Sequence, residues 1–450
     1  MRTMNHMSRP FRALGFFALG GLITTSTIFL TPHSGCSTPK LGLQDSPKAL
    51  VDEVWQIVNN TYVDGTFNHK DWQATRRELL TKNYGSKAQA YDAIRAALKK
   101  LDDPYTRFLD PQKFAELRQQ TSGELSGIGA KLALDKKTKA LTVIEAIADS
   151  PAFKAGLQSG DQILAVDGRS VQGLAVDKAV SLIRGKSGTL VKLKIARNGK
   201  QVFDVALTRQ LIQVSIVTSA VKQEGNKRIG YIHLSEFDDH ADEQIKKAIQ
   251  SLEKQKVQGF ILDLRDNPGG LLSMAINISR LWINDGAIVK TVLRNGSSTT
   301  DEADHTAVTD LPLTLLVDGG SASASEILTG ALKDHQRATI VGTKTFGKGI
   351  VQQVNPLSDG SGLNVTIAHY FTPNGTDIHH KGILPDVVVP LTKAQGKALA
   401  ENPKLLASPS DPQYVKAVQN VSKLIQANST PANTPTVSSG TTAPATGSIP

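Results

Sequence analysis

The segment from about residue 227 to residue 390 limits the possible folds most, because short apolar runs alternate in it with helical patterns. Four runs are uninterrupted enough to be buried strands, at 229–234, 260–264, 313–317 and 338–341. Helical patterns lie between them, at 242–254, 271–282 and 323–333. Strands that alternate with helices in this way predict an α/β layer.

The flanking segments have a different texture. Residues from 46 to about 120 are predicted to be helical, since Leu50, Val54 and Val58 recur at helical spacing. Between about 122 and 209, short β-rich runs punctuated by glycine take over. A helix near 414–426 precedes a tail rich in Ser, Thr, Pro, Ala and Gly, which cannot bury a core and is predicted to be disordered.

The first 36 residues have the order of an export signal. A basic start that ends at Arg12 is followed by a charge-free apolar run at 13–32, nearly long enough to span a bilayer if it is retained. Small residues precede Cys36, the only cysteine, as in a lipoprotein cleavage site, but His33 stands where an aliphatic residue is usual. A cleaved signal, a retained anchor and a lipidated Cys36 all place the body of the chain outside the cytoplasm.

The net charge of +10 does not by itself define a partner. No block of Lys and Arg with interleaved aromatic residues accompanies it, so nucleic acid is not a predicted partner. With one cysteine, no disulfide can form within the chain.

Three features fall together in the β-rich segment. A glycine-flanked turn, Gly127-Ile128-Gly129, leads into a strand, and an Ala-Gly-Leu…Gly-Asp-Gln-Ile-Leu string follows at 155–164. A helix at 174–183 then ends at Arg184. This combination resembles a PDZ domain, which implies that the turn's N–H groups bind a terminal carboxylate while the ligand adds to the sheet edge as a strand.

The apolar run at 313–317 leads into a serine-rich turn and then into a helix. A serine at such a turn can expose its hydroxyl, and a helix N-terminus stabilises negative charge beside it. Serines at helix starts are more often N-caps, however. The residues alone do not select among Ser321, Ser323 and Ser325.

Lys348 lies between two glycines, with Phe346 before it and Ile350 and Val351 after it. A lysine is a general base only when neutral, and at its ordinary pKa only about one in a few thousand is neutral at pH 7. The apolar neighbours favour burial, which would lower the pKa of Lys348. A solvated turn lysine is the alternative.

An Asn-Pro-Gly-Gly turn at 267–270 follows one predicted strand and precedes a helix. Its free backbone N–H groups are suited to an oxyanion hole, although a plain strand-to-helix turn explains the sequence equally well.

Taken together, these motifs resemble the carboxyl-terminal processing peptidases, which are PDZ-bearing Ser/Lys proteases. The match runs from about residue 51 to residue 390 and includes Asp-Pro-Tyr-Thr at 103–106. The resemblance implies an α+β multidomain chain with an N-terminal helical segment, a PDZ β-rich module and an α/β catalytic domain of the crotonase-like ββα type. The predicted limits are 1–36 for the export signal or anchor, 44–120 for the helical domain, 121–209 for the PDZ domain, 210–395 for the catalytic domain, 396–427 for a helical segment and 428–450 for the tail.

The resemblance also assigns roles to residues. It implies that Ser323 is the nucleophile, that Lys348 is the general base, and that Gln352, one helical turn beyond the lysine, orients it. The backbone N–H groups of Gly269 and Ala324 are the implied oxyanion donors.

Two further matches concern support and regulation. Glu326 is expected to support the site structurally, and Arg184 matches an arginine that links ligand binding to active-site assembly in some members. We therefore expect a serine endopeptidase that needs no metal or cofactor and acts on proteins with accessible C-termini. The expected location is the periplasm, cell envelope or thylakoid lumen, with membrane association through the N-terminus if the anchor is retained; the oligomeric state is not predicted.

The sequence is also compatible with two other functions. One is a PDZ-bearing Ser-His-Asp protease that would use His233, His240, His335 or His369, none of which lies in a recognisable motif. The other is a non-catalytic PDZ scaffold or holdase.

Overall fold

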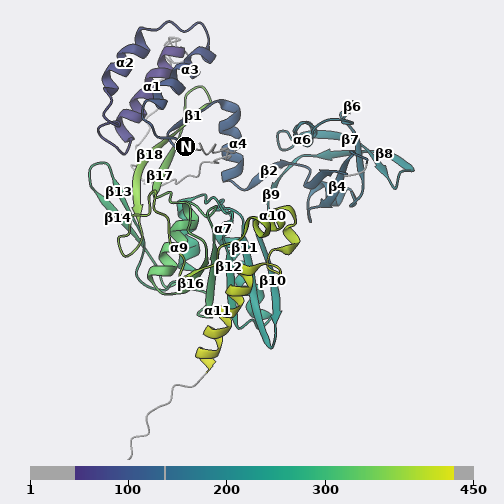
Figure 1. Cartoon of the computed structure of the whole chain (residues 1–450). Helices are drawn as coiled ribbons and strands as arrows, with labels where there is room; N and C mark the ends of the chain where they lie inside the picture. The colour runs from purple at the N-terminus through teal and green to yellow at the C-terminus, as the bar shows by residue number, and fades with distance from the viewer. Residues whose placement is uncertain (1–45, 136–137, 430–450) are drawn as a thin grey trace, which may run out of the picture.

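The computed structural model describes residues 46–135 and 138–429 (Figure 1). The predicted export signal with Cys36 and nearly all of the predicted tail lie outside the described residues. In the described part the predicted α+β multidomain architecture is confirmed, as a helical unit, a β-rich unit and a larger α/β unit (Figure 1). No described helix is both long and apolar enough to cross a membrane.

The N-terminal unit contains three helices that begin at Ser or Asp caps. The caps Ser46, Asp71 and Ser86 each accept a hydrogen bond from a backbone N–H in the first turn. Trp55 of the first helix stacks on Trp72 of the second, and both are buried. The elements are α1 (Pro47–Thr61), α2 (Trp72–Thr81) and α3 (Lys87–Lys99), followed by β1 (Arg107–Leu109) and α4 (Pro111–Thr121).

The β-rich unit is a sheet in the order β3-β4-β5-β7-β8, so that β3 is an edge strand. Helix α6 packs against this edge strand. Strands β2 and β9 pair with each other and connect the unit to the rest of the molecule (Figure 1). The elements are β2 (Glu124–Gly127), β3 (Ala130–Leu134), β4 (Leu141–Ala146), α5 (Pro151–Lys154), β5 (Gln162–Val166), β6 (Arg169–Ser170), α6 (Val176–Ile183), β7 (Leu190–Arg197), β8 (Gln201–Thr208) and β9 (Gln210–Gln213).

The α/β unit is built on a six-stranded sheet in the order β10-β11-β12-β15-β16-β19, which is parallel except at β10. The strands are β10 (Val217–Glu224), β11 (Lys227–Leu234), β12 (Gly259–Asp263), β15 (Leu313–Val317), β16 (Ala338–Gly342) and β19 (Val387–Val388). The helices are α7 (Ala241–Lys254), α8 (Leu272–Arg280), α9 (Ala324–Asp334), α10 (Lys393–Glu401) and α11 (Pro412–Ser429). Helix α11 includes Asn428 and Ser429, where the sequence predicts the start of the tail.

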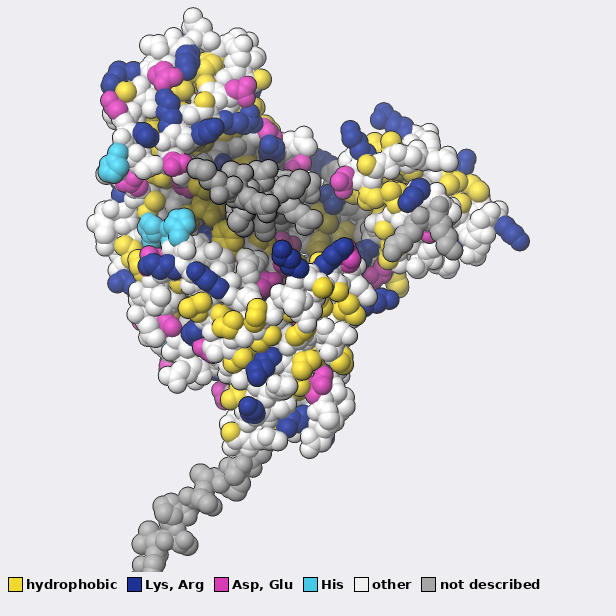
Figure 2. All heavy atoms as spheres, in the orientation of Figure 1, with side chains coloured by type: hydrophobic (Ala, Val, Ile, Leu, Met, Phe, Trp, Pro, Cys, Tyr) yellow, Lys and Arg dark blue, Asp and Glu magenta, His cyan; other side chains and the backbone are white. Residues whose placement is uncertain are grey.

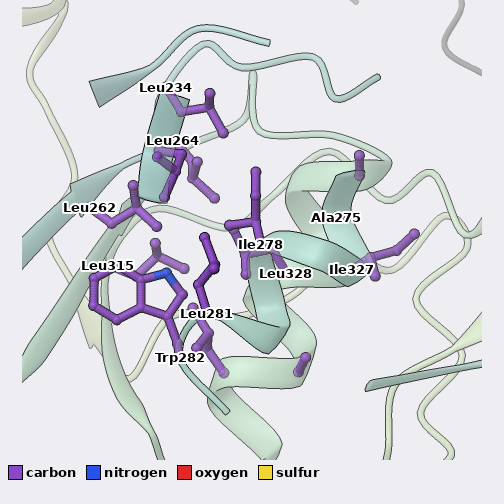
Figure 3. Close-up of a cluster of buried hydrophobic side chains, with 14 of the residues drawn as sticks. Leu234, Leu262, Leu264, Ala275, Ile278, Leu281, Trp282, Leu315, Ile327 and Leu328 are labelled. Atoms are coloured by element: carbon purple, nitrogen blue, oxygen red, sulfur yellow. The ribbon is translucent and has the colours of Figure 1, made fainter. Parts of the chain in front are cut away.

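Both faces of this sheet are covered by helices. Neighbouring residues along each strand point to opposite faces, so adjacent residues of one strand pack in different cores. Leu262 and Leu315 pack with Trp282 and the helices α8 and α9 (Figure 3). Ile261 and Leu316, which are adjacent to these two leucines along the strands, pack against α11 on the other face of the sheet. Burial on both faces explains why these strands are continuous apolar runs.

A second sheet is absent from the sequence prediction. Strand β18 (Gly362–Phe371) is its centre and pairs with β1, β13 (Ala287–Leu293) and β17 (Ile350–Pro356), while β14 (Ser298–Glu302) pairs with β13. Through β1, this sheet attaches the N-terminal helical unit to the α/β unit. Several of its strands are rich in polar residues, which weakens their signal in the sequence.

A buried ion cluster fixes the turn that follows β12. The guanidinium of Arg265 donates to the carboxylates of Asp263, at 2.6 Å, and Asp411, at 2.8 Å. Asp263 also accepts from the hydroxyl of Tyr231. Since Asp411 lies directly before α11, the cluster fastens the Asn-Pro-Gly-Gly turn to the C-terminal helix.

Candidate active site

The turn between β15 and α9 places Ser323 at the N-terminus of a helix. Ser323 has φ 55° and ψ −114°, a backbone conformation that is strained for a residue with a side chain. Such strain is maintained only where the surrounding structure enforces it, and it is frequent at functional sites. The N-terminus of α9 adds a favourable potential for negative charge at this position.

The three serines of the turn differ in what their hydroxyls do. The Ser321 hydroxyl donates to the carbonyl of Leu264 at 2.7 Å, and the Ser325 hydroxyl donates to the carbonyl of Asn267 at 2.9 Å. Both residues are wholly buried, whereas Ser323 retains 7% of its surface. The structure therefore separates Ser323 from its neighbours, which the sequence alone does not do.

Lys348 is buried in the loop between β16 and β17, with 3% of its surface exposed. Burial lowers the pKa of Lys348 to about 7; Arg107 lowers it further, while Asp103 and Glu326 act in the opposite direction. About half of the amines are neutral at pH 7 with such a pKa. A lysine in this state can accept a proton from a hydroxyl.

The predicted source of this burial needs a correction. Ile350 and Val351 are buried, but the Phe346 side chain is 51% exposed to solvent. The aromatic ring over the amine belongs instead to Tyr105, whose centroid lies 4.8 Å from Lys348 Nζ. The lysine is therefore enclosed by the tertiary structure more than by its sequence neighbours.

The Glu326 carboxylate connects the serine turn to the lysine loop. One oxygen accepts from the N–H groups of Ser323, at 3.0 Å, and Lys348, at 2.9 Å. The other accepts from the Gly347 N–H at 2.7 Å and from the Thr345 hydroxyl at 2.6 Å. Burial raises the pKa of Glu326, and these hydrogen bonds oppose the rise by stabilising the carboxylate. A single buried side chain thus fixes the backbone of both residues.

Tyr370, on β18, forms a second connection between the two segments. Its hydroxyl lies against the carbonyl oxygens of both Ser323, at 3.1 Å, and Lys348. Tyr370 is buried, and burial holds the pKa of its phenol well above the ordinary value. The phenol is therefore a fixed donor at this junction.

The predicted oxyanion residues lie beside the serine. A Cβ atom placed on Gly269 would lie 2.9 Å from both Ala324 N and Ser323 Cβ, and Gly269 has φ 100°, so only glycine fits this approach. The Ala324 N–H is the first of helix α9 and has no partner within the helix. The Gly269 N–H, however, donates to Asn267 Oδ1 at 2.9 Å. In this conformation one of the two predicted donors is therefore already engaged.

Gln352 is buried in strand β17, so the prediction that it lies one helical turn beyond Lys348 is wrong. The ladder between β17 and β18 has a register shift between Val351 and Gln352, and a bulge of this kind redirects a side chain. Both polar atoms of the Gln352 amide are buried without a hydrogen-bond partner among the described residues. This amide is thus free to bind another group.

The predicted peptide-binding residues lie apart from this site, in the β-rich unit. Gly127 ends β2, and Ile128 and Gly129 form the turn into the edge strand β3. Ile128 is buried in the core of the unit, and a Cβ on Gly127 would meet no atom within 4 Å. Arg184 is exposed at the end of α6.

The four histidines of the alternative triad belong to four different elements, β11, the start of α7, the end of α9 and β18. His335 ends helix α9, about 16 Å from its start at the usual rise per residue, and contacts the carbonyl of Ala287. His369 packs against His379. Among the described residues, no hydrogen bond joins any of these four histidines to Ser323.

Sequence reasoning missed three contributors to the site: Tyr105, Tyr370 and Asn267. Tyr105 belongs to the Asp-Pro-Tyr-Thr string, which is part of the family resemblance, but the sequence does not predict a role for the tyrosine in the active site. Asn267 belongs to the turn for which the sequence predicts backbone N–H donors but no role for a side chain. No feature of the sequence around Tyr370 indicates its position.

Comparison with known proteins agrees with this architecture. Residues 228–389 match the family model of peptidase family S41, and residues 116–196 match that of the PDZ domain. A carboxyl-terminal-processing protease of Synechocystis sp. is 42% identical over 92% of this chain and 94% of its own length. A chloroplastic carboxyl-terminal-processing peptidase 2 of Arabidopsis thaliana is 38% identical over 79% of this chain and 71% of its own length.

A solved structure of a photosystem II D1 C-terminal processing protease is also similar. It has a TM-score of 0.52 and 36% identity, over 82% of this chain and 99% of that one. These matches place the molecule in the class of serine peptidases that carry a PDZ domain. Within that class, the chain belongs to the carboxyl-terminal-processing proteases of peptidase family S41.

Proposed function

We propose that the chain is an endopeptidase that cuts proteins with Ser323 as nucleophile and Lys348 as general base. The neutral amine of Lys348 takes the proton of the Ser323 hydroxyl as the oxygen attacks a peptide carbonyl carbon. The resulting ammonium gives this proton to the leaving amine, and an acyl-enzyme remains. Water, deprotonated in turn by Lys348, then releases the acyl group.

One observation carries this proposal: a lysine with a lowered pKa lies on a loop that is fastened to the backbone of a strained, helix-capping serine. A surface lysine would be protonated and inactive as a base at neutral pH. A serine that only caps a helix would not require positive φ. The combination is expected for a base and its nucleophile.

The oxyanion would be stabilised by the N–H groups of Ala324 and Gly269. For Gly269 this role requires that its N–H be shared with, or released from, the Asn267 side chain. The unpartnered amide of Gln352 is suited to orient the Lys348 amine once substrate is bound.

The PDZ unit would select substrates by their C-termini. Among the described residues β3 pairs with β4 alone, so its other edge can accept a peptide strand. The turn at Gly127, Ile128 and Gly129 lies at the start of β3, where a terminal carboxylate would bind. Arg184 lies at the end of α6, the helix that packs against this edge. We propose that it couples ligand binding to the active site.

Substitution of the two proposed catalytic residues tests the mechanism. Ser323→Ala and Lys348→Ala should each abolish cleavage of a fluorogenic peptide, and a fluorophosphonate probe should label the unsubstituted protein at Ser323. Lys344→Ala is the matched control, because Lys344 is exposed in the same loop. Retained cleavage by Lys348→Ala would overturn the Ser/Lys pair, and failure to label Ser323 would favour a scaffold.

A pair of substrates tests recognition of the C-terminus. The same internal peptide bond should turn over faster when the peptide ends in a free carboxylate than when it ends in an amide. Equal rates for the two peptides would refute selection and gating by the PDZ unit.

We also propose that the protein is exported and acts in the periplasm, cell envelope or thylakoid lumen, and that residues 1–36 are a signal or an anchor. The basic and apolar segments up to residue 32 support this. Chloroplastic and cyanobacterial relatives support it as well. Mass spectrometry of the N-terminus of the mature protein, and of proteins that accumulate with Ser323→Ala, would test location and substrate together.

A further inference from the structure

The general base proposed above is covered by a segment from the N-terminal unit. This segment, Asp103-Pro104-Tyr105-Thr106-Arg107, leaves the helical bundle and enters β1. The Tyr105 ring lies over the Lys348 amine, with 4.8 Å between Nζ and the ring centroid. The lysine itself belongs to the α/β unit, so two separate units of the chain meet at this amine.

Hydrogen bonds hold the segment in a defined position. The Asp103 carboxylate accepts from the Tyr105 N–H at 2.8 Å and from the Thr106 hydroxyl at 2.7 Å. It also accepts from the Thr366 hydroxyl at 2.7 Å, and the Thr366 N–H donates to the Thr106 hydroxyl at 3.0 Å. Thr366 is the partner of Gln352 across the β17–β18 ladder. The segment is therefore anchored on the strand next to Gln352.

The charged and titratable groups around the amine come from several elements. Arg107 and Asp103 belong to the segment, and Glu326 belongs to α9. The phenol of Tyr370 lies on β18, and His379, whose pKa is lowered by burial, packs against Gly349 of the lysine loop. Arg107 is thus the cation that opposes protonation of the amine, and Asp103 is the anion on the same segment that favours it.

We propose that residues 103–107 are positioning residues of the peptidase: they hold the Lys348 amine against the Tyr105 ring and set the charge around it. The N-terminal helical unit is then a part of the catalytic machinery and not only a cap on the fold. The inference rests on the proposed role of Lys348 as the base.

The chemistry explains why an aromatic face suits this position. Lys348 is neutral before it accepts the proton of Ser323 and becomes an ammonium during acylation. An aromatic face attracts a cation within about 6 Å of its centroid, and it excludes water without offering a hydrogen-bond donor that would occupy the lone pair of the neutral amine. The ring therefore stabilises the state that forms in the reaction more than the resting state, as catalysis requires.

The charges on the segment give the sharpest test, because they act with opposite sign. Arg107→Gln removes a cation, so the acid limb of the kcat/KM profile should move to higher pH by about half a unit to one unit. Asp103→Asn removes an anion, so the limb should move to lower pH by a similar amount. Arg77→Gln, the same change at an exposed arginine of α2, should leave the limb in place. Limbs that stay fixed, or that move in the same direction in both variants, would overturn the proposal.

The ring is tested by a graded pair. Tyr105→Leu keeps an apolar side chain but loses the aromatic face, so kcat should fall about tenfold with little change in KM. Tyr105→Phe keeps the face and should lower kcat less. Equal losses in the two variants would contradict a role for the ring, and thermal unfolding of each variant separates this result from misfolding.

A measurement without catalysis distinguishes failure of this inference from failure of the proposed function. In the Ser323→Ala background, carbamylation of Lys348 by cyanate can be followed against pH by mass spectrometry. Its midpoint should move up with Arg107→Gln and down with Asp103→Asn. An unmoved midpoint overturns the inference even if Lys348 is the base, whereas moved midpoints together with an active Lys348→Ala variant would overturn the proposed function alone.

Discussion

Replacement of Glu326 by glutamine would test how the two proposed catalytic segments are held together. The Glu326 side chain is wholly buried, and its two oxygens accept four hydrogen bonds. Three of the donors are backbone N–H groups, of Ser323, Gly347 and Lys348, and the fourth is the Thr345 hydroxyl. A glutamine has the same shape but only one accepting oxygen.

The size of the effect follows from these contacts. The new amide NH2 would face either two N–H donors or one N–H donor and the Thr345 hydroxyl, which can turn and accept. At least one buried N–H is then left without a partner, at a cost of about 1 to 3 kcal/mol, and the remaining bonds lose the strength that a charged acceptor provides. Part of this cost is offset because the substitution removes a buried charge. We expect a net destabilisation of about 2 to 4 kcal/mol.

The assay combines urea unfolding with peptide cleavage. Glu326→Gln should lower the midpoint of unfolding and should reduce kcat at least a hundredfold, because the backbone of Ser323 and of Lys348 is no longer fixed. Glu302→Gln on the exposed strand β14 is the matched control. If both variants have the same stability and similar kcat, Glu326 does not hold the site together.

Three further predictions concern Lys348 and the connection to the PDZ unit. The acid limb of kcat/KM should have its midpoint near pH 7, because only the neutral amine accepts a proton and burial lowers the pKa of Lys348 to about 7; a limb near pH 10 would contradict this. Between about pH 7 and 10.5 the unfolded chain binds a proton that the folded chain does not, so the contribution of Lys348 makes stability rise with pH in this window, and the cost of burying the lysine is largest at and below pH 7. Lys348→Met should therefore be inactive but more stable by roughly 2 to 4 kcal/mol at pH 7 in urea unfolding, and a less stable variant would count against the lowered pKa. Gly123→Ala should destabilise the protein by more than Gly168→Ala, because both have positive φ but only the Gly123 Cβ would meet an atom, Asp238 Oδ2 at 2.0 Å; equal losses would show that this contact relaxes without cost.

The sequence predicted the elements whose physical signal is local. The strands β11, β12, β15 and β16 are apolar runs because both faces of their sheet are covered, and the helices between them have a clear period. The glycine-flanked turns were also recognisable, since few residues adopt the backbone that such turns require. The second sheet was missed, because several of its strands carry polar residues and because two of its pairings, β1 with β18 and β13 with β18, join distant parts of the chain.

The candidate site divides in the same way. From the sequence alone, Ser323 and Lys348 were candidates only in each other's company and through a family resemblance. The fold distinguishes Ser323, because the hydroxyls of Ser321 and Ser325 are bonded to backbone carbonyls. It also lowers the pKa of Lys348 by burial, with Tyr105 from the distant N-terminal unit lying over its amine. Motifs determine which groups are available, but exposure, burial and the state of a proton depend on every surface packed around a side chain, and those surfaces exist only in the folded chain.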